Sequence, residues 1–178
     1  SAGEEDLFVK ANREFTQFNP LVHGVKCIMP ARDGKIWVGT KAGLGVIEGG
    51  NFRLFASNDG VPRLDIRCLA EAAEGTIWAG GGAGHLYRVR GMQGEAMVPP
   101  GPRTPQPIWS VLADTNGVIW AGTFRGGLLR FAGGKFSRVS TQHGLPDDVI
   151  CQLLDDEHGN LWMGSQRGIF RVAKTELE

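Results

Sequence analysis

Three cations, Lys41, Arg125 and Arg167, are the side chains whose type and spacing best suit a ligand site. Each stands at or beside one position of a segment that recurs along the chain, so a repeated fold would bring them to similar places. Converging ammonium and guanidinium groups bind carboxylates, uronates or phosphates through charge-assisted hydrogen bonds. The sequence therefore predicts an anion site here; the alternative is that the three are solvated loop residues.

Asp59, His143 and Asp147 are further candidates, because they lie in the loops that join one repeat to the next. Those loops should emerge on the same side of the molecule as the loops that carry the cations. The predicted ligand is an unidentified small molecule, and an anionic saccharide is one candidate.

Catalytic and metal-binding patterns are not evident. The histidines His23, His85, His143 and His158 share no ligand spacing, and Cys27, Cys68 and Cys151 form no CxxC pair. The sequence has no nucleophile elbow, phosphate loop or His-Glu-x-x-His motif. Paired carboxylates occur at 147–148 and 155–156, where aspartates favour turns by bonding their own backbone. We expect a non-enzymatic protein without a metal or cofactor, and small buried thiols.

The elements that must position these residues follow from a repeat of 41 or 42 residues, marked by Trp37, Trp78, Trp120 and Trp162. The pattern is an apolar stretch, a glycine-containing turn, a tryptophan strand, a Gly-Thr-x-x-Gly element and a Phe-x-x-Phe segment, and the copies depart from it at some positions: the second has Gly-Gly-Gly in place of Gly-Thr. Asp-Gly and Asn-Gly turns favour type I′ hairpins, which need positive φ at both central residues. Four short antiparallel strands per repeat are typical of a β-propeller blade.

The sequence thus predicts an all-β chain, 1–178, of about four blades, with repeats near 20–56, 60–98, 102–140 and 143–173. The tryptophans are expected to pack between blades rather than to form a ligand cage, since each blade has only one. The second copy departs from the pattern: its outer strand is replaced by 91–98, before a proline-rich stretch.

Residues 1–18 supply a spare strand, whereas the last repeat stops without its Phe-x-x-Phe strand. We expect the spare strand to complete the last blade, because open edge strands invite association. It would do so within one chain as a four-blade ring, or across a homodimer of half-rings.

Composition excludes several other functions. Lys plus Arg equals Asp plus Glu at 19 each, which argues against a nucleic-acid surface or a polybasic membrane anchor. No apolar run approaches the roughly 18–20 residues that a spanning helix needs, and the acidic start is unlike a signal peptide. We expect neither nucleic-acid binding nor direct membrane insertion.

The repeat resembles the two-component regulator propeller family in its Asp-x-x-Gly-x-Leu-Trp-x-Gly-Thr core, followed by Phe-x-x-Phe and Gly-Leu-Pro. The closest copy runs from His143-Gly144-Leu145-Pro146 to Asn160-Leu161-Trp162-Met163-Gly164-Ser165. The resemblance implies a ligand-sensing, periplasmic or extracytoplasmic module of a bacterial signalling protein, whose parent carries a histidine kinase or cyclase domain. A structural or protein-interaction propeller is the alternative, and a propeller lyase is less favoured.

Overall fold

The computed structural model describes residues 8–11, 14–17, 23–99 and 105–177, and in this part of the chain the ordered elements are strands and short 3₁₀ turns. Three sheets have four antiparallel strands, one has three and one has two. The predicted all-β propeller architecture is confirmed. None of the described segments forms a helix long and apolar enough to cross a membrane.

The strands follow the predicted order in every blade. Blade one has β3 (Val25–Pro30), β4 (Ile36–Thr40), β5 (Gly43–Glu48) and β6 (Asn51–Leu54). Blade two has β7 (Ile66–Glu71), β8 (Ile77–Gly81), β9 (Leu86–Arg90) and β10 (Gln93–Met97). Blade three has β11 (Ile108–Ala113), β12 (Ile119–Thr123), β13 (Leu128–Ala132) and β14 (Lys135–Val139). Blade four has β15 (Ile150–Asp155), β16 (Asn160–Ser165) and β17 (Gly168–Ala173).

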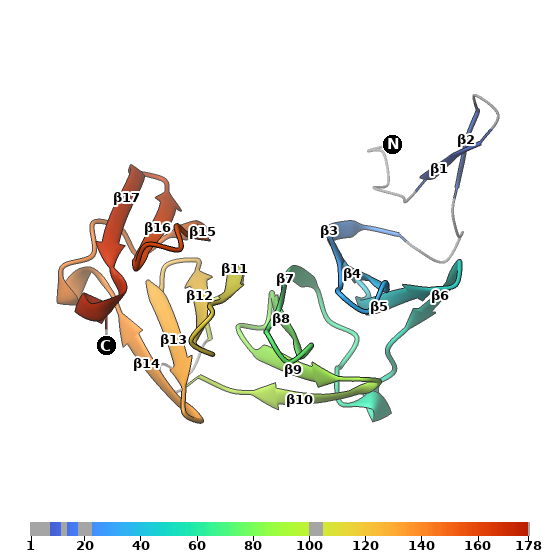
Figure 1. Cartoon of the computed structure of the whole chain (residues 1–178), viewed down its shortest axis with the longest axis horizontal. Helices are drawn as coiled ribbons and strands as arrows, with labels where there is room; N and C mark the ends of the chain where they lie inside the picture. The colour runs from blue at the N-terminus through green and yellow to red at the C-terminus, as the bar shows by residue number, and fades with distance from the viewer. Residues whose placement is uncertain (1–7, 12–13, 18–22, 100–104, 178) are drawn as a thin grey trace.

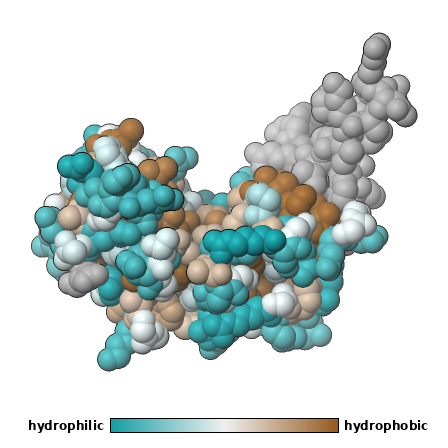
Figure 2. All heavy atoms as spheres, viewed as in Figure 1, coloured by the Kyte–Doolittle hydropathy of each residue, from teal (hydrophilic) through white to brown (hydrophobic). Residues whose placement is uncertain are grey.

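The four blades stand side by side along an open arc, with the inner strands β3, β7, β11 and β15 towards the concave side (Figure 1). Neighbouring inner strands contact one another, so the concave side is a continuous surface. The outer surface is mixed in polarity, and hydrophobic atoms gather at both ends of the arc (Figure 2).

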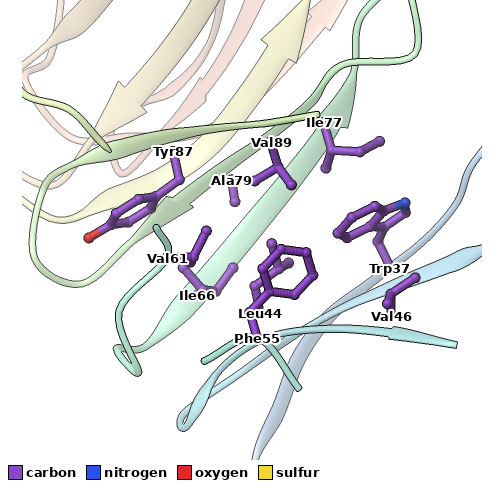
Figure 3. Close-up of a cluster of buried hydrophobic side chains, with 10 residues drawn as sticks. All are labelled: Trp37, Leu44, Val46, Phe55, Val61, Ile66, Ile77, Ala79, Tyr87 and Val89. Atoms are coloured by element: carbon purple, nitrogen blue, oxygen red, sulfur yellow. The ribbon is translucent and has the colours of Figure 1, made fainter. Parts of the chain in front are cut away.

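The blades are held together by tryptophans. In the first interface, Trp37, Leu44 and Phe55 of blade one pack against Ile66, Ile77 and other residues of blade two (Figure 3). Trp78 and Trp120 occupy the same place in the next two interfaces. Because each large ring is shared by two sheets, a blade buries its apolar faces only when it is stacked. The prediction that the tryptophans form inter-blade packing is confirmed for these three.

The turns between the first two strands differ from the predicted type I′ hairpins. In blade one the Gly34 amide donates to the Ala31 carbonyl oxygen at 3.0 Å, and the Ala31 amide donates to the Lys35 carbonyl oxygen at 2.8 Å. Only Gly34 in this turn has positive φ. This is a three-residue loop that ends in a left-handed glycine, and the extra residue explains why Asp33 does not need the left-handed conformation.

The N-terminal strand that was predicted to complete blade four does not pair with it. Strand β2 (Glu14–Gln17) pairs with β1 (Phe8–Ala11) in a two-stranded sheet of its own, and blade four has three strands. The arc is open in Figure 1, so the chain does not complete the last blade with its own β2. The hairpin bonds between β1 and β2 take the place of the predicted pairing with β17. Completion across a homodimer stays a prediction.

The C-terminal 3₁₀ turn η3 (Lys174–Leu177) fastens blade four to blade three. Its Leu177 side chain is buried in the interface between them. The Lys174 ammonium lies 2.8 Å from the Asp155 carboxylate and 3.8 Å from that of Asp114, which belongs to blade three. The turn therefore adds an ionic link to the apolar packing.

Candidate functional site

The concave side holds a cavity of about 290 Å³ to which each blade contributes one side chain. Among the described residues its lining consists of Lys26, Arg67, Trp109 and Cys151. All four occupy the same position of the repeat, which is 11 residues before the blade tryptophan. A position shared by all repeats therefore carries four chemically different side chains around one space.

A β-bulge in every inner strand creates this position. The register shifts between Val25 and Cys27 in blade one, and at the equivalent place in the other three blades. A bulge opposes two residues on one strand to a single partner residue, which leaves the extra residue unpaired and re-aims its side chain. The extra residue is the cavity residue in each case. The bulge thus turns one side chain per blade towards the arc's centre.

The Trp109 side chain of the cavity is held by aromatic contacts. Its ring stacks on that of Phe124 with centroids 4.7 Å apart and 24° between planes. The guanidinium of Arg125 lies over the Phe124 ring, 5.0 Å from its centroid. The indole Nε1 of Trp109 is buried without a hydrogen-bond partner. A fixed flat ring with an unused N–H donor is suited to a ligand that has both a flat face and an acceptor.

The two cations give the cavity its charge. Arg67 is partly neutralised, because its Nε lies 2.6 Å from an Asp65 carboxylate oxygen, while the rest of its planar guanidinium remains a donor fork. Lys26 adds a second positive charge from blade one. Burial, and then the charge of Asp147, raise the pKa of the Cys151 thiol. Cys151 is therefore a neutral thiol near neutral pH and a poor nucleophile.

The structure places the sequence-predicted cations on the rim of the concave side rather than in the cavity lining. Lys41 is exposed, and its alkyl chain lies over Gly24. Arg125 is exposed with φ of 66° and is joined to Trp109 through the Phe124 stack. Arg167 is exposed, and one guanidinium nitrogen donates to the Pro146 carbonyl oxygen at 3.3 Å. Of the three, Arg125 is thus connected to the cavity through ring contacts.

The loops that carry these cations do lie beside the loops that join the blades. The amides of Lys41 and Phe124 donate to the carbonyl oxygens of Gly24 and Pro107, and Gly127 donates to that of Asp148. The prediction that both sets of loops emerge on one side of the propeller is confirmed by these contacts.

Asp147 interacts electrostatically with Arg167. Its carboxylate accepts a hydrogen bond from the Val149 amide at 3.0 Å. Burial would raise the pKa of Asp147, but hydrogen bonds from Val149 and the Ser165 hydroxyl, together with the charge of Arg167, outweigh burial and lower it. The structure therefore brings one predicted cation and one predicted carboxylate together on the rim.

Asp59 and His143 have a structural role. Each is the third residue of a short 3₁₀ turn in a blade-joining loop, η1 (Ser57–Asp59) or η2 (Thr141–His143). The Asp59 carboxylate accepts from the Ala56 amide at 2.8 Å, and His143 Nδ1 accepts from the Ser140 amide at 3.2 Å. Both side chains thus satisfy a backbone donor at the start of the turn, as in a capping box.

The paired carboxylates also serve turns, as predicted. The Asp148 carboxylate accepts from the Thr141 amide, and Asp155 from the Glu157 amide. The Asp156 carboxylate accepts from the His158 and Asn160 amides. All three cysteines are free, and Cys68 is buried as expected, whereas Cys27 and Cys151 are half-buried.

Sequence reasoning missed the cavity residues because it placed the site at the loop cations Lys41, Arg125 and Arg167 and not in the inner strands. A signal was present 11 residues before each blade tryptophan. There, side chains of different size and charge follow a valine or isoleucine in every copy. No group of three or more metal-ligating side chains occurs in the part of the chain that the structure describes.

Comparison with known sequences identifies the repeat. Residues 103–125 and 144–167 match the model of the two-component regulator propeller. These two segments are similar to two-component regulator propeller repeats. The matched segments contain the inner strands and tryptophan strands of blades three and four, including Trp109 and Cys151. A search of curated proteins finds no match to the sequence.

Among solved structures, the extracellular domain of a bacterial signalling protein is similar to this chain. The chain is 22% identical to the extracellular domain of BT4673 from B. thetaiotaomicron, with a TM-score of 0.74 over 90% of this chain and 24% of that one. BT4673 is described as a one-component and as a hybrid two-component system. The chain therefore spans about a quarter of the length of this neighbour.

Propellers with other functions are also similar. Virginiamycin B lyase from Staphylococcus aureus is 15% identical with a TM-score of 0.64, over 83% of this chain and 55% of the lyase. The WD40 propeller of Doa1 is 15% identical with a TM-score of 0.68, over 84% of this chain and 50% of that one. At such identities the likeness establishes the propeller fold and leaves the function to be argued from the site.

Proposed function

We propose that this chain is the propeller part of an extracytoplasmic sensor in two-component-type signalling. In this role the propeller binds a small anionic ligand on its concave side and does not transform it. Two lines of support are the two-component regulator propeller repeats and the likeness to the extracellular domain of BT4673.

The observation that carries the proposal is the meeting of Lys26, Arg67, Trp109 and Cys151 at one cavity. The blade scaffold repeats in all four copies, but these four side chains differ in charge, size and polarity. Packing alone gives no reason for two cations and an indole with an unpartnered N–H at this position. Recognition of a ligand does give one, because specificity rests on a few polar groups in a concave site.

The ligand chemistry follows from these groups. A carboxylate would accept hydrogen bonds from the Arg67 fork and from Lys26, and a flat ring or sugar face would lie on Trp109. Arg125 and Arg167 on the rim would attract the same negative charge from solution. A uronate, which combines a carboxylate with a sugar ring, meets these requirements and serves as the probe.

The proposed propeller binds its ligand without converting it chemically. Among the described residues that line the cavity, Cys151 has a raised thiol pKa and so stays protonated near neutral pH. In such a sensor the signal is binding of the ligand itself, and no product is formed.

Isothermal titration calorimetry with galacturonate, and with galactose as the neutral counterpart, tests the proposal. We expect binding of galacturonate and not of galactose. Arg67→Gln should weaken binding about 10- to 100-fold, as expected for loss of a hydrogen bond to a charged group, about 1.5–3 kcal/mol. Lys135→Gln makes the same charge change on the exposed outer strand of blade three and should leave binding unchanged.

Two outcomes would contradict the proposal. One is that Arg67→Gln and Trp109→Leu both leave the affinity for galacturonate unchanged, which would show that the ligand binds outside the cavity. The other is chemical conversion of galacturonate, followed by NMR, which would make the protein an enzyme. An Arg125→Glu variant tells whether the rim contributes, since charge reversal there should lower affinity if it does.

A protein-interaction propeller is the second candidate function. It is favoured by the apolar side chains that blade four exposes at the end of the arc.

A further inference from the structure

Asp65 is a carboxylate at a repeat position where the other blades carry no charge. It stands 13 residues before the blade tryptophan, and its counterparts are Gly24, Pro107 and Val149. The position has a backbone role: the Asp65 carbonyl oxygen accepts from the Gly82 amide at 2.9 Å, and those of Gly24 and Pro107 accept from the equivalent loop amides. A glycine and a proline fill this role as well, so the role does not explain the carboxylate.

The glycine run of blade two makes room for Asp65. Gly81 stands at the repeat position of Thr40, Thr123 and Ser165. Both threonine hydroxyls donate to carbonyl oxygens within their own loops. A Cβ built on Gly81 would collide with the Asp65 carbonyl oxygen, and one on Gly82 would lie 3.2 Å from Asp65 Oδ2. The close approach of Asp65 therefore accounts for the departure of this copy from the Gly-Thr pattern.

The Asp65 side chain holds Arg67 by one edge. Its Oδ2 lies 2.6 Å from Arg67 Nε, and within the described part of the chain this is the one hydrogen bond of the guanidinium. The two terminal nitrogens therefore remain donors for a ligand. Stability gives little reason for the pair, because both side chains are partly exposed and exposed ion pairs contribute little. Asp65 Oδ1 is moreover buried without a partner among the described residues, which costs stability.

Asp65 also sets the charge beside the cavity. Lys26 and Arg67 bring two positive charges and Asp65 brings one negative charge, so these three groups together carry a single net positive charge. The field of Asp65 extends to blade one. Burial raises the pKa of the Cys27 thiol to about 11; a backbone hydrogen bond at Gly39 opposes the rise, and the charge of Asp65 adds to it. Because Cys27 adjoins Lys26, a ligand held between Lys26 and Arg67 would also lie within this field.

We propose that Asp65 is a positioning residue of the anion site, which orients Arg67 towards the ligand and makes the site select a monocarboxylate over a dianion such as a phosphate ester. The inference rests on the proposed ligand-binding function. A carboxylate that fixes one edge of the guanidinium presents an ordered donor fork, so less side-chain freedom is lost on binding. The Asp65 charge repels a ligand in proportion to the ligand's own charge, so a dianion is opposed by twice the free energy.

Calorimetric titration with galacturonate and with galactose 1-phosphate tests the selection, at pH 8, where the phosphate is a dianion. Asp65→Asn keeps an acceptor for Arg67 Nε and removes the charge. It should strengthen galacturonate binding about 3- to 10-fold and phosphate binding by the square of that factor, about 10- to 100-fold. Asp65→Ala makes the same charge change without the acceptor and should bind galacturonate about 3- to 10-fold more weakly than Asp65→Asn. Asp33→Asn is the matched control: Asp33 pairs with Lys35 at 2.8 Å in the first turn of blade one, and both affinities should stay unchanged.

A measurement without ligand separates this inference from the proposed function. The NMR signal of the Arg67 Nε–H group, assigned from its loss in Arg67→Gln, should exchange slowly with water in the wild type and in Asp65→Asn, and rapidly in Asp65→Ala. Slow exchange that persists in Asp65→Ala would overturn the positioning role, whether or not galacturonate binds. Equal gains for the two ligands in Asp65→Asn would overturn the charge selection. If the wild type binds neither ligand, the proposed function is contradicted, and the exchange of Arg67 still decides whether Asp65 holds it.

Discussion

Replacing Asp114 with alanine should strongly destabilise blade three. The Asp114 carboxylate is buried and accepts hydrogen bonds from the Asn116 amide at 2.8 Å, the Val118 amide at 3.0 Å and the Trp120 Nε1 at 3.0 Å. It thereby ties the hairpin turn to the tryptophan that fills the interface with blade four. Lys174 reaches it at 3.8 Å from the C-terminal turn.

The magnitude follows from burial. A hydrogen bond to a charged group contributes about 1.5–3 kcal/mol, and such contributions are not additive within one network. Removing one partner from a buried charged network costs about 3–5 kcal/mol, because the remaining polar groups lose their partners. We expect Asp114→Ala to lower the free energy of unfolding by about 3–5 kcal/mol. Blade two has Ala72 at this position, and there the Trp78 Nε1 is buried without a partner.

Blade four provides the matched comparison. Asp156 accepts from the His158 and Asn160 amides and from Trp162 Nε1, so the turn amides and the indole bond as they do at Asp114. Because Trp162 is exposed, water can replace the lost acceptor, and Asp156→Ala should destabilise clearly less than Asp114→Ala.

The assay is urea unfolding followed by tryptophan fluorescence, at a concentration where the chain has one oligomeric state. Equal losses for the two variants would refute the argument that burial, rather than the number of hydrogen bonds, determines the cost. Asp114→Asn should fall in between, since it keeps a carbonyl acceptor and removes the charge.

Three further substitutions have defined outcomes in the same assay. Gly60→Ala should cost more than Gly144→Ala: both glycines have positive φ, but only a Cβ at Gly60 meets a backbone carbonyl of blade two. Asp147→Asn should lower stability by a constant amount above about pH 4 and by less as the pH falls further, because a carboxyl with a lowered folded pKa loses its contribution on protonation. Cys68→Leu should cost about 1–3 kcal/mol by overpacking, whereas Cys151→Leu should change stability by no more than about 0.5 kcal/mol; equal costs would show that the cavity position is part of the packing.

The sequence was sufficient for most of the fold because a repeat supplies the same information four times. Each copy carries the tryptophan, the glycines and the alternating apolar residues, so the order of strands and the inter-blade role of Trp37, Trp78 and Trp120 could be predicted. The turn type could not be predicted from Asp33-Gly34 alone. Both a two-residue and a three-residue loop end in a left-handed glycine, and the backbone hydrogen bonds decide between them.

The cavity was hidden for a different reason. Strand patterns assign side chains to faces by strict alternation, and a single inserted residue breaks the alternation without changing the composition. Cys68 packs against blade three, with its Sγ 3.8 Å from the Ile108 carbonyl oxygen. Arg67, one residue earlier, reaches the cavity instead. The rim residues Asp59 and His143 could be placed in loops, but their capping bonds depend on loop geometry.

The bulge also explains how strict packing and a varied site coexist in one repeat. In a regular strand successive side chains alternate between the two faces of the sheet, and in a propeller both faces pack against neighbouring blades. Any change along such a strand would disturb an interface. The bulged residue belongs to neither face, so Lys26, Arg67, Trp109 and Cys151 can differ while the residue before each remains a valine or an isoleucine. The side chain at this one position per blade can therefore change with little effect on the packing between blades.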